Sequence, residues 1–138
     1  KGFSIEGFFA EKEQEEQQEI EAGLKLLEIK QALIRYQFDT YNDYPKAASN
    51  NAKRALKWVE KNGWGRCGEA TGKQRANQLA KGERISRDTI ARMASFKRHQ
   101  QYKDVPYDEG CGGLMWDAWG GDEGVNWAIR KLKQIDNA

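Results

Sequence analysis

Residues 110–127 read GCGGLMWDAWGGDEGVNW, and the composition of this stretch is the strongest indication of the fold. It contains six glycines together with three tryptophans, Trp116, Trp119 and Trp127. Glycine inside a regular element costs roughly 0.5–1 kcal/mol relative to alanine, so clustered glycines indicate close backbone approach and sharp turns. Tryptophan buries a large apolar surface. We therefore expect the three tryptophans to close a small core, with an aromatic binding pocket as the alternative.

Short helical patterns lie on both sides of this stretch. Asp122 is expected to cap a final helix. Three earlier helices are predicted at 45–62, from Thr71 to Gly82, and from a cap at Ser86 onward. The sequence thus predicts an all-α fold, in which residues 44–138 form a compact bundle of four to five short helices with Gly-rich loops.

A long helix is predicted before this bundle, in residues 10–43, which contain no proline and one glycine, Gly23. Its first half is acidic, and its second half is amphipathic. One stripe follows a spacing of alternately four and three residues: Ile20, Leu24, Leu27, Gln31, Ile34, Phe38 and Tyr41. A further set, Leu26, Ile29, Leu33 and Tyr36, is expected to widen this apolar face. Either the second half packs in the core of its own domain, or the stripe pairs with a partner helix.

The first nine residues, KGFSIEGFF, alternate in a manner typical of a short extended segment. The expected organisation is therefore an extended segment at 1–9, a long helix at 10–43 and a helical Trp/Gly-rich module at 44–138. No stretch approaches the roughly 20 apolar residues of a membrane span, so no membrane association is expected.

The net charge of +2 hides strong segregation along the chain. Residues 53–103 hold fourteen Lys and Arg against four acids, whereas residues 1–21 hold seven Glu against two Lys. A basic block of this kind is typical of a surface that binds nucleic acid or an acidic partner. The candidates for such contacts are Lys53, Arg54, Lys57, Lys73, Arg75, Arg84, Arg87 and Arg98.

Catalytic motifs are weak in this sequence. GWGRCG at 63–68 has the spacing of a dinucleotide-binding loop, but it follows a predicted helix where that motif requires a strand. His99 has no acid nearby in sequence. Cys67 and Cys111 are too few for a zinc site; we expect reduced, structural thiols, with a disulfide as the open alternative. No catalytic residue, metal site or cofactor is expected.

Two runs of residues together resemble a known module. They are PKAASNNAKRALKWVEKNGWGRCGEATGKQRANQLAKGERISRDTIARMASFKRHQ at 45–100 and GGLMWDAWGGDEGVNWA at 112–128. The pattern is similar to a small helical module of tailed-phage head-morphogenesis proteins, often attached to the C-terminal side of a prohead (capsid maturation) protease domain. KGFSIEGFF resembles, more loosely, the closing strand of that protease domain.

The resemblance implies a role in capsid assembly. The serine-type catalytic domain would lie upstream of Lys1, so none of its catalytic residues maps onto this chain, and this part is expected not to be an enzyme. The implied function is an adaptor, scaffold-like or auxiliary head protein, assembled in the bacterial host cytoplasm and retained in the virion. Expected partners are capsid or portal-proximal proteins, with self-association through the long helix as a further option. The alternative function is a DNA-contacting basic module inside the head.

Overall fold

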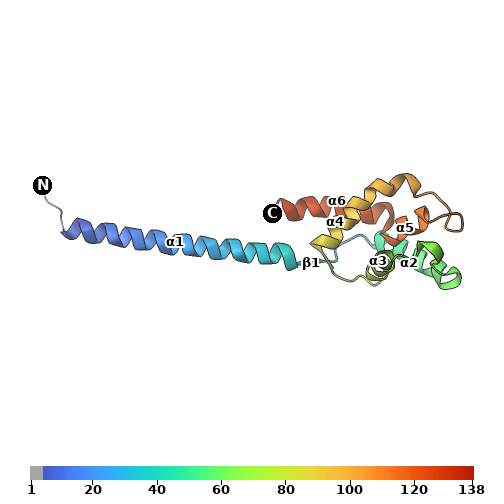
Figure 1. Cartoon of the computed structure of the whole chain (residues 1–138), viewed down its shortest axis with the longest axis horizontal. Coiled ribbons are helices and arrows are strands. Elements are labelled where there is room, and N and C mark those ends of the chain that lie inside the picture. The colour runs from blue at the N-terminus through green and yellow to red at the C-terminus, as the bar shows by residue number, and fades with distance from the viewer. Residues whose placement is uncertain (1–4) are drawn as a thin grey trace. The chain divides into compact units, whose positions relative to one another are not determined.

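The structure is a computed structural model that describes residues 5–138. It divides into two units between Gln37 and Phe38, and each unit is described by itself. Figure 1 shows that the fold is all-α, as the sequence predicts. The six α-helices of the described residues are α1 (Ile5–Phe38), α2 (Lys46–Asn62), α3 (Ala70–Ala80), α4 (Arg87–Ser95), α5 (Gly112–Ala118) and α6 (Gly121–Asp136). Two 3-10 helices, η1 (Gly65–Cys67) and η2 (Phe96–Tyr102), and two short strands, β1 (Thr40–Tyr41) and β2 (Ile85–Ser86), connect them.

Helix α1 is a single uninterrupted helix of 34 residues (Figure 1). The prediction of an extended segment at 1–9 is wrong for Ile5 to Phe9, which are helical, and its remaining part lies outside the described residues. A lone strand without a neighbour leaves its backbone groups unpaired, whereas a helix pairs them internally. The predicted end of the helix at residue 43 is also too late, because α1 stops at Phe38 and Tyr41 lies in β1.

The expectation that the second half of α1 lies in a core is wrong. None of its residues is buried, and Leu24, Leu27 and Leu33 are each more than half exposed. The sequence pattern correctly marked an apolar face but could not determine what covers it.

The core of the C-terminal unit lies between α2 and the helices around it. Ala48, Ala52 and Ala55 of α2 are fully buried, and their small side chains allow α3, α5 and α6 to approach its backbone. Helix α4 packs mainly on α6 (Figure 1). The larger core side chains are Leu79, Ile90, Met93, Leu114, Trp119 and Trp127. Trp116, Trp119 and Trp127 are exposed by only 4%, 8% and 6%, so all three lie inside this unit.

Two of the predicted helix boundaries carry clear physical signals. Ser86 accepts a hydrogen bond from the backbone N–H of Thr89 and caps α4, as predicted. Gly63 ends α2 with φ of 72°, a conformation that favours glycine.

Two other predicted caps are wrong. Helix α3 begins at Ala70 after Glu69, so Thr71 does not start it. Asp122 is in the first turn of α6, and the cap position is taken by Gly120 with φ of 102°. Gly120 and Gly121 turn the chain sharply between α5 and α6. Asp122 therefore accepts hydrogen bonds from side chains outside α6.

The two cysteines form a disulfide, so the expectation of reduced thiols is wrong. Cys67 ends η1 and Cys111 precedes α5, and their Cα atoms are 5.4 Å apart. The two residues are separated by 44 positions in sequence, and only the packing of α2, α3 and α5 brings them together.

Candidate functional site

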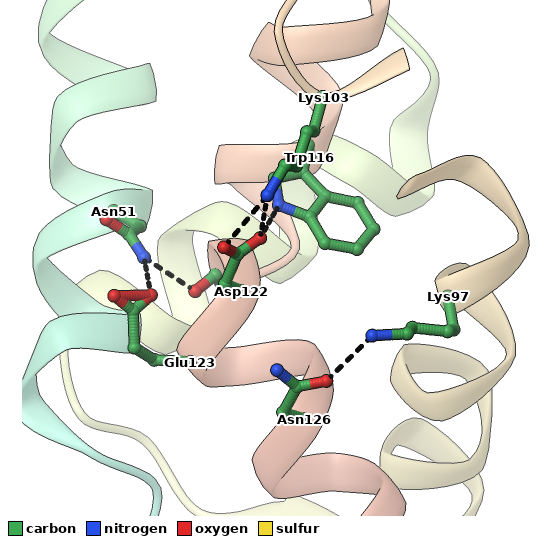
Figure 2. Close-up of polar contacts among 8 residues, drawn as sticks. Asn51, Lys97, Lys103, Trp116, Asp122, Glu123 and Asn126 are labelled. Atoms are coloured by element: carbon green, nitrogen blue, oxygen red, sulfur yellow. Dashed lines mark hydrogen bonds and ion pairs between the residues drawn. The ribbon is translucent and has the colours of Figure 1, made fainter. Parts of the chain in front are cut away.

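Asp122 lies at the corner between α5 and α6, where Figure 2 shows its carboxylate facing the side-chain nitrogens of Lys103 and Trp116. Its carboxylate accepts hydrogen bonds from Trp116 Nε1 at 3.0 Å and from Lys103 Nζ at 3.1 Å. Partial burial acts to raise the pKa of Asp122, but these two donors outweigh burial and hold that pKa below its usual value. Asp122 thus forms a structural ion pair with Lys103 and also accepts a hydrogen bond from Trp116.

A second set of contacts holds α2 against the same corner (Figure 2). The buried side-chain amide of Asn51 donates to the backbone oxygen of Gly120 and to Glu123 Oε2, each at 2.9 Å. On the other side of α6, Lys97 Nζ donates to Asn126 Oδ1 at 3.1 Å. Every labelled polar side chain in this view has a partner, so the corner serves to fix the helices.

Asp117, on α5, has its own partners. Its carboxylate accepts a hydrogen bond from the hydroxyl of Tyr107 and an ion pair from Arg54 Nη1 at 3.5 Å. Burial raises the pKa of Asp117, although the Tyr107 hydrogen bond and the Arg54 charge both act to lower it. Burial, followed by the hydrogen bond to Asp117, also raises the pKa of Tyr107.

An acid–base site would need His99, Asp117 and Asp122 in one cleft. His99 lines a cavity that neither Asp117 nor Asp122 lines, and the two carboxylates are held by the partners described above. This particular set of groups is therefore not assembled.

A cavity with a volume of about 690 Å³ lies between η1, α3, α4, η2 and the start of α5. Its cationic lining consists of Arg66, Arg92 and Arg98, and the His99 ring also lines it. Its aromatic lining consists of Phe96, Tyr102 and Trp119, and the Cys67–Cys111 disulfide forms part of the wall. The sequence predicted only Arg98 and Trp119 from this set. The GWGRCG loop was the available signal, since it contributes Arg66 and Cys67.

The eight predicted basic contact residues do not form one open surface. Arg75 is 3% exposed, and four others have side-chain or backbone partners: Arg54 with Asp117, Arg84 with Thr40 and Asn42, Arg87 with Asp136, and Arg98 with Ser95. Lys53, Lys57 and Lys73 are exposed. The sequence showed that the block is basic, but it could not show which charges are used within the fold.

Helices α3 and α4, with the turn between them, do not form a DNA-binding helix-turn-helix. Helix α3 packs mainly on α2, and α4 packs mainly on α6. In a DNA-binding helix-turn-helix the two helices pack on each other and orient the second in the major groove.

The stripe predicted to bind a partner helix lies along α1, with Ile20, Leu24, Leu27, Ile34 and Phe38 each more than half exposed. Tyr41 is not part of it, because it lies in β1 with Lys131 Nζ 4.8 Å from its ring centroid. We call these five residues of α1 the first seam.

A second apolar row of α1 consists of Leu26, Ile29 and Leu33, which are 53%, 51% and 59% exposed. At about 100° per residue these side chains lie roughly half a turn around the helix from the first seam. The expectation that these residues widen the first apolar stripe is therefore wrong. They form a second seam on the opposite side of α1.

No protein family, curated protein or solved structure matches this chain. Within residues 5–138, no helix combines the length and the apolar character that crossing a membrane requires. The same residues hold no cluster of three or more His, Cys, Asp or Glu that could bind a metal ion.

Proposed function

We propose that this protein is a non-enzymatic component of a phage head, in which α1 acts as a connecting helix between neighbouring proteins during capsid assembly. The proposal combines the resemblance of the C-terminal module with one structural observation: α1 carries two exposed apolar seams on opposite sides. It remains part of the proposal that the protein is assembled in the host cytoplasm and retained in the virion.

The two seams support a connecting role because each exposes apolar side chains that are available to pack against a partner helix. In water, most of the stability of a helix comes from packing an apolar face, and α1 has no buried residue. A helix with one seam pairs with one neighbour, whereas opposite seams allow contact with two neighbours at once. One neighbour would be another copy of this chain, and the other a helix of a capsid or portal-proximal protein.

The test is retention of the polypeptide in purified proheads, measured by mass spectrometry of gel bands. Leu24→Glu with Leu27→Glu changes the first seam, and Leu26→Glu with Leu33→Glu changes the second. Lys30→Glu is a matched control, since it alters the net charge by the same two units between the seams. We expect both seam variants to be lost from proheads and the control to be retained. Absence of the wild-type polypeptide from proheads would overturn the proposal.

The DNA-contacting alternative rests on fewer groups than the sequence indicated. Six of the eight cations are exposed, while Arg87 is half-buried and Arg75 is buried. Of these six, Arg54, Arg84 and Arg98 have partners within the fold. If several cations contact DNA phosphates, the affinity for random duplex DNA should fall by orders of magnitude as the salt concentration rises from about 50 to 200 mM. Binding that is insensitive to salt over this range would exclude that alternative.

A further inference from the structure

The cavity of about 690 Å³ is independent of the α1 seams, because it lies wholly within the C-terminal unit. Its size falls in the range of sites for small organic ligands, roughly 300–1,000 Å³. Its walls contain cationic side chains and aromatic side chains, and each of these two groups favours a different part of a ligand.

The charges of the lining favour an anion. Arg66, Arg92 and Arg98 line the cavity, and Glu69 is the one carboxylate among the lining residues that the structure describes. A guanidinium presents a planar fork of N–H donors that matches phosphate and carboxylate oxygens. Three such groups around one opening leave an excess of positive charge.

A fourth guanidinium lies behind the cavity wall. Arg75 is 3% exposed, its guanidinium carbon lies 5.1 Å from the ring centroid of Trp119, and it donates to the side chain of Gln78. Its Nε has no hydrogen-bond partner, and within the described residues it forms no ion pair with a carboxylate. Burial lowers the pKa of Arg75, and the positive charge of Arg92 lowers it further. Because a buried cation without a counter-charge is costly, an anion beside Arg92 would stabilise both groups.

The aromatic lining favours a planar apolar group on the ligand. Phe96 stacks on Trp119 with ring centroids 4.8 Å apart, and Arg75 lies over the same indole, so the faces of the Trp119 ring are covered. Tyr102, which is 50% exposed, offers the open aromatic face. The indole N–H of Trp119, which lines the cavity, has no acceptor among the described residues. An aromatic face and a donor without an acceptor suit a heterocyclic ring, which offers both a stacking surface and acceptor atoms.

The position of these walls is fixed by local features of the chain. The Cys67–Cys111 disulfide holds η1 against the start of α5. A Cβ atom at Gly112 would collide with the backbone oxygen of Tyr102, so glycine there is required for η2 to lie against α5. The disulfide and the close approach at Gly112 thus fix the positions of the cavity walls.

We propose that this cavity binds a nucleoside phosphate unit, with the phosphate at Arg66, Arg92 and Arg98 and the base against the aromatic wall. The ligand is either a free nucleotide or the terminal nucleotide of a single DNA strand. Both sources present the same chemistry to the cavity.

The test uses the purified chain and deoxyadenosine 5′-monophosphate, followed by calorimetry and by the NMR signal of the Trp119 indole N–H. We expect a shift of that signal and a Kd below about 1 mM. Arg92→Gln and Arg98→Gln should each weaken binding by about tenfold or more, as expected for lost hydrogen bonds to a charged group. Arg130→Gln, at an exposed position outside the cavity, is the matched control and should leave Kd unchanged.

Four further ligands make the outcome decisive. Deoxyadenosine and inorganic phosphate should each bind at least about tenfold more weakly than the nucleotide, because each lacks one half of the recognised unit. A 5′-phosphorylated oligodeoxyadenylate that binds more tightly than the mononucleotide identifies a strand terminus as the source, and weaker binding identifies the free nucleotide. No Trp119 shift, equal binding of deoxyadenosine, or equal binding of an acidic phenylalanine-containing peptide would overturn the proposal.

Discussion

The side-chain amide of Asn51 donates a hydrogen bond of 2.9 Å to the backbone oxygen of Gly120, which joins α2 to the turn between α5 and α6. The same amide donates to Glu123 at 2.9 Å. Asn51, which lies among the buried alanines of α2, therefore holds the turn at Gly120 and Gly121 in place. Close backbone approach of this kind is what the glycines of residues 110–127 indicated.

Asn51→Ala should destabilise the C-terminal unit. It removes the hydrogen bonds of the Asn51 amide to the Gly120 carbonyl and to the charged Glu123 side chain, and their loss costs about 1–3 kcal/mol. The Gly120 carbonyl keeps its hydrogen bond from the Gly124 N–H. The measurement is the free energy of unfolding from urea titration. Asn50→Ala is the control, because Asn50 is an exposed neighbour on the same helix. Equal stability of the two variants would contradict the role assigned to Asn51.

Gly121→Ala should be more destabilising than Gly82→Ala. Both glycines have positive φ, 66° and 70°, so both substitutions carry a backbone cost of about 1–2 kcal/mol. A Cβ at Gly82 meets nothing within 4 Å, whereas a Cβ at Gly121 collides with the side chain of Asn51. The difference between their unfolding free energies isolates the collision, and combining Gly121→Ala with Asn51→Ala should cost less than the sum.

Asp122→Asn should reduce the pH dependence of stability in acid. The folded-state pKa of Asp122 is lowered, so the carboxylate contributes stability above its unfolded pKa of about 3.9, and this is lost as pH falls through the folded pKa. The stabilities of wild type and variant should therefore differ at neutral pH and converge in strong acid. Asp88→Asn, at a side chain that is 90% exposed, is the control in these pH-dependent thermal melts. A constant difference at every pH would contradict the prediction.

Reduction of the disulfide should destabilise the C-terminal unit. The bond links residues 44 positions apart, and chain-entropy arguments give about 4 kcal/mol for a loop of this length. Urea unfolding with and without a reducing agent measures the effect, and the Cys67→Ser, Cys111→Ser double variant should match the reduced protein. Insensitivity of that variant to the reducing agent confirms that this bond is responsible.

Local signals in the sequence were sufficient for most of the fold. Ser86 and Gly63 mark helix ends through side-chain capping and positive φ, which depend on a few neighbouring residues. The β1–β2 pair could not be predicted, because two residues per strand carry no alternation and the pairing of Thr40 with Ser86 depends on the tertiary fold.

The candidate sites were less accessible from sequence for a related reason. The first seam follows from spacing alone, but its exposure does not. The cavity brings together Arg66, Arg92 and Tyr102 from three separate elements, and no spacing rule connects them. The pairing of Cys67 with Cys111 likewise depends on how α3 and α5 pack against α2.

The Cys67–Cys111 disulfide also determines how the chain responds to a protease. The segment that it encloses contains α3, α4 and the exposed turn from Lys81 to Arg84. A trypsin cut in that turn would divide the backbone, yet both fragments would stay covalently joined and migrate together until they are reduced. A nicked molecule would therefore keep α4, α5 and α6 attached to the fragment that carries α1, α2 and α3.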